Sequence, residues 1–354
     1  MGLTQALTEQ ILELRKETSL ELLVASSENE MEPGLHKKID EAGVRKEIVN
    51  GLDVHSDFKA KARQLGRIIK ENGITHVNVH NNWQLALIAY AKYGGIIPKK
   101  FKVIYSIHGY RHNASAVKSA IARGIIGSGL LMFADRVHSM STYVSNKFRL
   151  LGYKTDLVYY MMDKPEYKKE KNEIKGAPLE MVFPAQFRHG KQQDMLIEAV
   201  KIYVDKTGDC SIRLYLPGDG ERRGEMMALA KGYGLEENVV FPGKMAHKDI
   251  LDLYNRTNVA LVSSNVETYG RCIAEPFMLG RCLLTVPTGV ALDIIKPGEN
   301  GDYFNTAEEL AEKLVKLHGE PELVMKMANQ AFIDRRVFSR DEVMKSYLES
   351  LDKA

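Results

Sequence analysis

The sequence has little cysteine and no long hydrophobic run, and these absences exclude several classes of protein. Its 354 residues include only three cysteines, Cys210, Cys272 and Cys282, without CxxC spacing or nearby paired histidines. Neither a disulfide framework nor a zinc site is indicated, and a reducing cytoplasm fits this usage. The longest nearly uninterrupted apolar run, residues 124–134, is about half of the roughly 20 residues that a membrane-spanning helix needs. The start of the chain lacks the basic and apolar regions of a signal peptide, so we expect a cytoplasmic location.

Net charge is also small over the whole chain, but its distribution is uneven. Lysine and arginine number 49 against 46 aspartate and glutamate residues, which gives +3. Residues 37–154 nevertheless carry 20 basic and 7 acidic residues, a local net charge of +13. The segments 1–36 and 155–354 each come to −5. This basic region indicates an anionic partner; the alternative is a solvated basic face that binds nothing.

Short apolar runs alternate with longer amphipathic ones, a pattern that predicts an α/β protein. With 44% hydrophobic residues, the chain is too apolar to be disordered and long enough for two domains. The expected strands are residues 20–25, 76–80, 103–107, 136–140 and 157–160, then 180–184, 213–216, 239–241, 259–262 and 283–286. Because no hairpin signals separate these runs, the strands should be parallel.

A polar stretch near the middle of the chain marks the expected domain boundary. We expect an N-terminal domain over residues 1–163, a linker over 164–177, a C-terminal domain over 178–335 and a C-terminal helix over 336–354. The first domain begins with a helical pattern at residues 3–16 and not with a strand. In a doubly wound sheet the first strand lies in the middle, so we expect a missing central strand and a natural reading frame that extends upstream.

The most informative segment is residues 259–280, which predicts a strand, a polar loop and then a helix that begins near Gly270. A helix N-terminus presents unpaired backbone N–H groups and a partial positive charge, and so it can hold a diphosphate. Glu267 lies in the loop and Glu275 about one and a half turns into the helix, so both carboxylates can accept hydrogen bonds from sugar hydroxyls in one crevice. The alternative is that both are ordinary solvated glutamates.

This segment resembles the Glu-x7-Glu motif of the retaining GT-B glycosyltransferases of family 4, also called glycosyl transferases group 1. The flanking segments that extend the resemblance are residues 214–220, 239–244, 252–259, 289–295 and 298–301. The resemblance implies a GT-B fold, in which two doubly wound Rossmann-like domains face a cleft, with the acceptor domain first and the C-terminal helix crossing back to it. It also implies transfer of a sugar from a nucleotide diphosphate sugar to a hydroxyl, with retention of anomeric configuration.

The resemblance implies roles for particular residues. Glu275 would hold the ribose, Glu267 the donor, and His108, directly after the strand over residues 103–107, the donor sugar. Similar enzymes place an arginine and, five residues later, a lysine against the diphosphate. Lys191 matches the lysine, but Gln186 stands at the arginine position, and Arg188 is a candidate replacement. The remaining donor-binding residues implied are Gly243, Lys244, Thr268, Tyr269 and Gly270.

Other interpretations of these segments are open. The glycines at positions 218 and 220 suggest a dinucleotide site, but the next glycine, Gly224, is one place late, and a tight turn is the simpler explanation. The histidine pairs His76/His80 and His108/His112 lack an accompanying carboxylate for a metal site. Residues 114–134 predict an apolar helix that either belongs to the core or presses against a membrane.

We therefore expect an enzyme that needs no cofactor besides its donor substrate and, since no Asp-x-Asp motif occurs, no metal. The expected partners are a nucleotide sugar, a glycan or lipid-linked acceptor of envelope or surface polysaccharide synthesis, and an anionic membrane surface to which the cytoplasmic protein binds peripherally. No nucleic acid is expected. Two alternatives stay open: a GT-B sugar-nucleotide epimerase or hydrolase, and a non-catalytic or weakly active nucleotide-sugar binding protein.

Overall fold

The computed structural model describes residues 2–18, 20–26, 33–49, 52, 55–108, 129, 131–150, 152–162 and 178–354. The chain forms two compact units, one of Met1–Met161 with Arg340–Ala354 and one of Met162–Ser339. The expected linker over residues 164–177 lies outside the described residues, as does most of the helix expected over 114–134. The two units are called the N-terminal and the C-terminal unit below.

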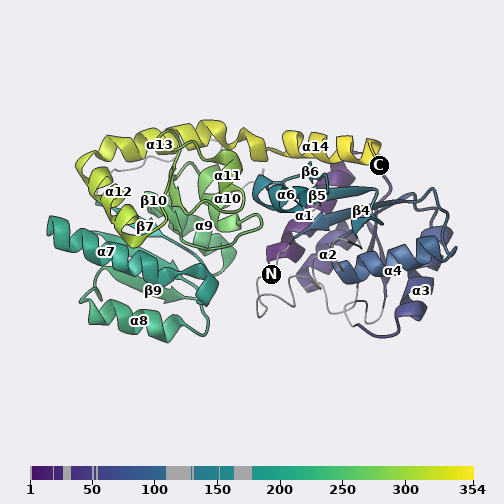
Figure 1. Cartoon of the computed structure of the whole chain (residues 1–354), viewed down its shortest axis with the longest axis horizontal. Coiled ribbons are helices and arrows are strands. Elements are labelled where there is room, and N and C mark those ends of the chain that lie inside the picture. Colours follow the sequence, from purple (N-terminus) through teal and green to yellow (C-terminus); the bar gives the residue numbers. More distant parts are fainter. Residues whose placement is uncertain are drawn as a thin grey trace. The chain divides into compact units, whose positions relative to one another are not determined.

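The C-terminal unit is a doubly wound α/β domain (Figure 1). Its six strands pair in the order β12-β11-β10-β7-β8-β9, and every pairing between them is parallel. The strands are β7 (Glu180–Val182), β8 (Arg213–Pro217), β9 (Val239–Gly243), β10 (Val259–Val262), β11 (Cys282–Thr285) and β12 (Asp302–Tyr303). The helices are α7 (Gln193–Thr207), α8 (Arg223–Gly232), α9 (His247–Arg256), α10 (Arg271–Met278), α11 (Ala291–Ile294), α12 (Ala307–Gly319) and α13 (Pro321–Asp334), with 3-10 turns η1 (His189–Lys191) and η2 (Arg335–Phe338).

The core of this unit explains why its strands are continuous apolar runs. Every residue of β10 and of β11 is buried, because helices cover both faces of a parallel sheet. Helices α7 and α12 pack on each other, and α10 and α13 pack against β11. Complete burial of a valine or leucine side chain contributes about 1.5–3 kcal/mol, so these central strands form a rigid base for the loops at their ends.

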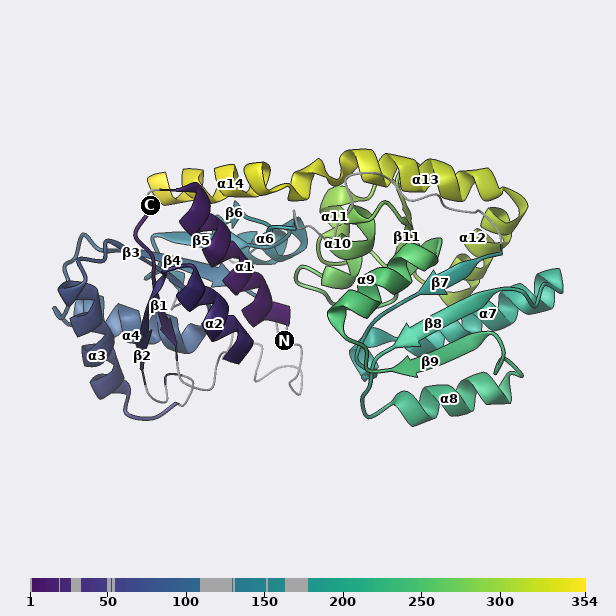
Figure 2. The ribbon, with the colours of Figure 1, turned by 180° about the vertical axis from the view of Figure 1, so that it is seen from behind.

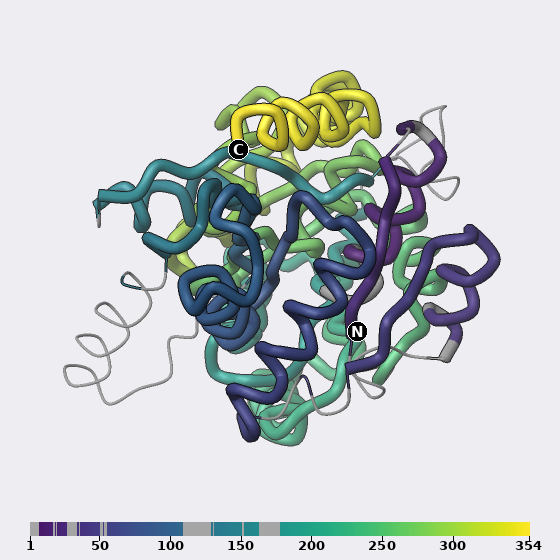
Figure 3. Tube along the Cα trace, turned by 90° about the vertical axis from the view of Figure 1, so that its right-hand side faces the viewer, coloured from purple at the N-terminus to yellow at the C-terminus, as the bar shows by residue number. Residues whose placement is uncertain are grey.

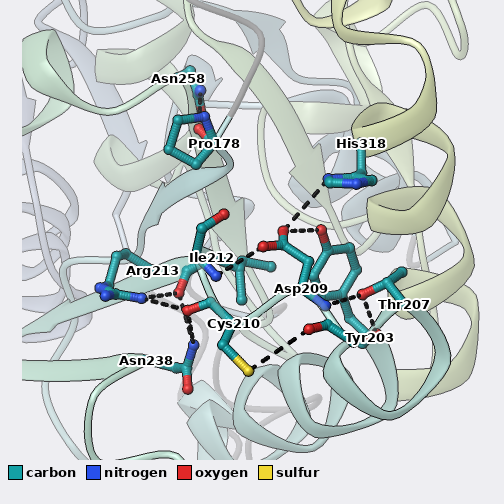
Figure 4. A network of polar contacts seen from close by, with 12 residues as sticks. Pro178, Tyr203, Thr207, Asp209, Cys210, Ile212, Arg213, Asn238, Asn258 and His318 are labelled. Carbon is teal, nitrogen blue, oxygen red and sulfur yellow. Dashed lines mark hydrogen bonds and ion pairs between the residues drawn. The ribbon is translucent and has the colours of Figure 1, made fainter.

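At the amino edge of this sheet the polar groups bond to one another (Figure 4). Asp209 accepts a hydrogen bond from the Tyr203 hydroxyl at 2.7 Å and lies 3.4 Å from Nδ1 of His318. The Asn238 amide donates to the carbonyl oxygens of Cys210 at 3.1 Å and Ile212 at 3.0 Å. Burial alone raises the pKa of Asp209, but hydrogen bonds from Ser211 and Tyr203 outweigh it and lower the pKa below its ordinary value. Asp209 thus joins the loop before β8 to α7, through Tyr203, and to α12, through His318.

The N-terminal unit has its strands in two separate sheets. The strands are β1 (Leu23–Ser26), β2 (Arg45–Ile48), β3 (His76–Val79), β4 (Lys102–Ile107), β5 (Arg136–Ser139) and β6 (Asp156–Leu157), and the helices are α1 (Gly2–Glu17), α2 (Pro33–Glu41), α3 (Phe58–Glu71), α4 (Asn82–Tyr93), α6 (Thr142–Arg149) and α14 (Arg340–Asp352). Strand β1 pairs only with β2, and β3 pairs with β4, within the described ranges. The expected absence of a central strand stays a prediction.

The last helix, α14, belongs to the N-terminal unit (yellow in Figure 2 and Figure 3). Its apolar residues Val343, Met344 and Tyr347 pack with Leu14 of α1 and Val158. The buried hydroxyl of Ser350 donates to Asp156 at 2.6 Å and lies 2.8 Å from Nε2 of His138. A polar anchor therefore accompanies the apolar contact.

Candidate functional site

The candidate site of the C-terminal unit lies where the strand order reverses. Strands β7 and β10 are neighbours, but the chain runs from β7 toward β8 on one side and from β10 toward β11 on the other. The loops that leave two such strands separate and open a crevice, which is where ligands bind in open α/β sheets. The Ser263 hydroxyl donates to the carbonyl oxygen of Lys191 at 2.8 Å, and the backbone N–H of Asn265 donates to that of Gly190 at 3.0 Å. These bonds fix the two loops together.

Two of the predicted site residues meet at this point. The Nζ atom of Lys191, from η1, forms an ion pair with Oε1 of Glu267, from the loop after β10. The Lys191 side chain is 12% exposed and that of Glu267 is 15% exposed, so water screens this pair little. The sequence placed both residues at the site, and the structure places them in direct contact.

Glycine residues allow the loop of Glu267 to pack closely on its neighbour. The Glu267 amide donates to the Thr288 hydroxyl at 2.9 Å, and the Val290 amide donates to the Tyr269 carbonyl at 2.8 Å. Gly289 has a φ of +53°, and a Cβ there would lie 2.6 Å from the carbonyl oxygen of Tyr269. A side chain at position 289 would therefore displace the loop that carries Glu267.

Helix α10 begins immediately after this loop and carries the second predicted carboxylate. Glu275 is buried, and its Oε1 atom lies 2.8 Å from Nε2 of His247 and 2.8 Å from Nε of Arg271. Burial alone raises the pKa of Glu275, but the hydrogen bond from His247 and the charge of Arg271 outweigh burial and lower the pKa. Glu275 is therefore an ionised acceptor near neutral pH and is not a solvated residue of the helix surface.

Cys272 lies in the same helix but is not a nucleophile candidate. Its Sγ atom is 3.9 Å from Oε1 of Glu267. Burial and the neighbouring carboxylate raise the pKa of this thiol, so it stays protonated. All three cysteines are free thiols.

The glycines at positions 218 and 220 serve a tight turn, as the simpler sequence interpretation held. A Cβ on Gly218 would lie 1.9 Å from the Ala185 carbonyl oxygen, and one on Gly220 would lie 2.5 Å from that of Phe187. The turn thus packs on the loop that leads from β7 to Lys191. Gly243 is part of the same contact, because its carbonyl accepts from the Gly218 amide at 2.8 Å, whereas Lys244 is exposed.

The remaining predicted residues of this unit lie at the same edge with different exposure. Gln186 and Arg188 are both exposed, and Arg188 directly precedes η1. Thr268 is half-buried, while Tyr269 and Gly270 are buried at the start of α10. The first amides of any helix lack intrahelical acceptors, so the N-terminus of α10 is suited to an anion.

In the N-terminal unit, the predicted His108 belongs to a chain of rings at the carboxyl ends of β3, β4 and β6. Nδ1 of His80 lies 2.7 Å from Nε2 of His108, and Nδ1 of His108 bonds to the Tyr160 hydroxyl. Burial lowers the pKa of His80 to about 4, and burial together with the nearby His80 lowers that of His108. Both imidazoles are therefore neutral near pH 7 and suited to neutral hydrogen-bonding groups.

Sequence reasoning missed three residues of these clusters, which are Arg271, His247 and Tyr160. Arg271 is four positions before Glu275 and could have been found, because helical spacing brings such a pair together. No local pattern connects His247 with Glu275, 28 positions away, or Tyr160 with His108. Within the described ranges, no group of three or more His, Cys, Asp or Glu side chains is arranged to hold a metal ion.

Comparison with known proteins shows which fold this chain shares. Residues 164–333 match the family model of the glycosyl transferases group 1. HepE of Anabaena, solved in complex with UDP, is 17% identical with a TM-score of 0.80, and the match covers 100% of this chain and 97% of that one. The lipopolysaccharide outer core galactosyltransferase WaaB matches with a TM-score of 0.77 and 14% identity over 99% of this chain and 96% of its own. The chain thus has the GT-B fold of glycosyltransferases.

Curated relatives match this chain over different shares of their length. The N-acetyl-alpha-D-glucosaminyl L-malate synthase of Bacillus anthracis is 21% identical over 284 residues, which are 77% of this chain and 72% of that enzyme. For two further bacterial relatives the match spans only 42% and 46% of their length. In the part of the chain that the structure describes, no helix has both the length and the apolar character to cross a membrane.

Proposed function

We propose that the protein is a retaining glycosyltransferase that moves a hexosyl or N-acetylhexosaminyl group from a nucleotide diphosphate sugar to an acceptor hydroxyl. The observation that carries this proposal is the ion pair of Lys191 and Glu267 at the switch point of the C-terminal sheet, in the loop that leads into α10, the helix of the buried Glu275. A cation and a helix N-terminus suit a diphosphate, and buried carboxylates suit ribose and sugar hydroxyls.

The residues of the candidate site have different roles in donor binding. Glu275 accepts hydrogen bonds from the ribose, and Glu267 accepts from the donor sugar. Lys191, Arg188, and the backbone amides of Thr268, Tyr269 and Gly270 neutralise the leaving diphosphate, so the transfer proceeds without a metal. Gly243 and Lys244 complete the donor pocket, and His108 acts on the sugar.

Retention follows in this proposal from attack on the same face as the leaving group. The new glycosidic bond forms as the bond to the diphosphate oxygen breaks, and the departing phosphate takes the proton of the acceptor hydroxyl. Negative charge develops on that phosphate in the transition state, and Lys191 stabilises it.

The acceptor in this proposal is a glycan or lipid-linked hydroxyl compound of envelope or surface polysaccharide synthesis. The local charge of +13 over residues 37–154 supports an anionic acceptor or an anionic membrane surface. The protein then works in the cytoplasm and binds the membrane peripherally.

A non-catalytic nucleotide-sugar binding protein is the second candidate, and Gln186 favours it because one expected cation is absent. Release of nucleoside diphosphate separates the candidates, measured with a panel of sugar nucleotides, with and without glycan acceptors, in the presence of a chelator. Acceptor-dependent release, with the donor's anomeric configuration in the product by NMR, supports the proposed transfer. Release or isomerisation without acceptor favours the hydrolase or epimerase alternative, and binding without turnover favours the non-catalytic one.

A further inference from the structure

Each carboxylate of the candidate donor site is neutralised by its own cation. Glu267 pairs with Lys191, and Glu275 pairs with Arg271, whose Nη2 lies 2.7 Å from Oε1. Such pairing lowers the cost of holding a buried carboxylate, and Glu275 retains only 6% exposure. The two cations and the two carboxylates balance, so a diphosphate that enters the site needs more positive charge than these two pairs offer while both are formed.

Arg271 is placed to meet that need. It is the first residue of α10, one position after Gly270, and its side chain is 20% exposed. A guanidinium group binds phosphate oxygens in a bidentate manner, which favours arginine over lysine at such a position. Gln186, at the position where similar enzymes carry an arginine, offers no charge.

We propose that Arg271 supplies a further cation for the donor diphosphate, in addition to Lys191 and Arg188, and that it leaves Glu275 when the donor binds. This inference rests on the proposed function. When Arg271 leaves, the Glu275 carboxylate can accept hydrogen bonds from the ribose hydroxyls. One movement thus allows the contact of Arg271 with the diphosphate and that of Glu275 with the ribose. His247, 2.8 Å from Oε1, stays on Glu275 and prevents the buried carboxylate from losing all its partners during the exchange.

Two variants of the ion pair test the exchange by their opposite effects on a ligand without ribose. In titration calorimetry with inorganic pyrophosphate, Arg271→Gln should bind more weakly than the wild type. Glu275→Gln should bind more tightly, because Arg271 no longer has to leave an anion. A merely structural ion pair predicts no such opposite signs. Arg256→Gln and Asp252→Asn, which change the same charges at exposed positions of α9, should bind pyrophosphate as the wild type does.

Nucleotides then distinguish the phosphate role from a general loss of the site. For UDP or GDP, whichever the wild type binds, Arg271→Gln should lose about 10-fold or more in affinity, the loss expected for a charged hydrogen bond. The corresponding monophosphate should lose less, and Arg271→Lys should restore part of the difference. Circular dichroism confirms that each variant is folded.

The outcomes distinguish a failure of this inference from a failure of the proposed function on which it rests. Failure of the wild type to bind either diphosphate contradicts the proposed function. Diphosphate binding that Arg271→Gln leaves unchanged, or that only Arg188→Gln weakens, overturns the assignment of Arg271 alone. Equal weakening of pyrophosphate by Arg271→Gln and Glu275→Gln overturns the exchange.

Discussion

The Nε2 atom of His247 lies 2.8 Å from Oε1 of Glu275, so a residue at the start of α9 holds a carboxylate in the middle of α10. Because an ionised carboxylate can only accept hydrogen bonds, Nε2 of His247 carries the hydrogen in this contact. The contact orients Glu275 and favours its ionised form, which is the form that accepts hydrogen bonds from hydroxyl groups.

Replacement of His247 by phenylalanine should make nucleotide binding more sensitive to acid. Without the hydrogen bond, burial of Glu275 is less well offset, and the pKa of the carboxyl rises toward or above its ordinary value. More of the variant's Glu275 is then protonated as the pH falls from about 7 to about 5. Nucleotide affinity measured across this range should fall more steeply in the variant than in the wild type. His76→Phe, at an exposed position of β3, is the control, and parallel curves for all three proteins would contradict the role of His247.

Lys191→Ala should weaken donor binding strongly, by about 10-fold or more, because a charge-assisted hydrogen bond to phosphate is lost. The variant also leaves Glu267 without its ion-pair partner.

Gln186→Arg should be tolerated and should tighten binding, since it restores a cation at the position where similar enzymes have one. Titration with the donor checks both, with the exposed Lys206→Ala as the control. Full activity of Lys191→Ala in the presence of a chelator would place diphosphate neutralisation elsewhere.

Ser350→Ala should destabilise the N-terminal unit by about 1–3 kcal/mol, because it leaves the buried His138 and the half-buried Asp156 without the hydroxyl that joins them. Chemical denaturation measures this loss. Ser346→Ala, on the exposed side of the same helix, should change stability by no more than about 0.5 kcal/mol. If the two variants proved equally stable, the polar contact would have no part in anchoring α14.

The sequence predicted the C-terminal sheet well because its strands are apolar runs bounded by glycine turns. The expected strand over residues 259–262 coincides with β10, and the one over 213–216 with most of β8. Strand β2, with the residues Arg45, Lys46 and Glu47, was missed because three charged side chains hide the strand pattern. Strand β12 has only two residues and gives no pattern at all.

The candidate site was predictable to the extent that it lies in one continuous motif. Glu267, Gly270 and Glu275 share a loop and a helix, so their proximity follows from local structure. The contact between Lys191 and Glu267 joins residues 76 positions apart and depends on the pairing of β7 with β10. The contact of His247 with Glu275 depends on how α9 packs against α10, which single-sequence patterns do not specify.

Binding to membranes should require anionic lipid and should fall as salt rises. Each lysine or arginine near an anionic leaflet contributes about 1 kcal/mol, and the attraction fades within a Debye length of about 8 Å at physiological salt. Sedimentation with liposomes, at low and at physiological salt, measures this for neutral vesicles and for vesicles that contain phosphatidylserine. Equal binding to both kinds of vesicle, or none to either at low salt, would remove the membrane surface from the proposal and leave the transferase untouched.

The most direct test of the central claim, that the switch-point site of the C-terminal unit binds a nucleotide sugar, is ligand-induced thermal stabilisation. The wild type, Glu275→Ala and the exposed control Glu312→Ala are heated with UDP-glucose, UDP-N-acetylglucosamine and GDP-mannose. A ligand at about 100 times its Kd stabilises the folded state by about 2.7 kcal/mol, which raises the midpoint clearly. The account predicts that at least one donor stabilises the wild type and Glu312→Ala but not Glu275→Ala. Equal stabilisation of all three proteins, or of none, would contradict it.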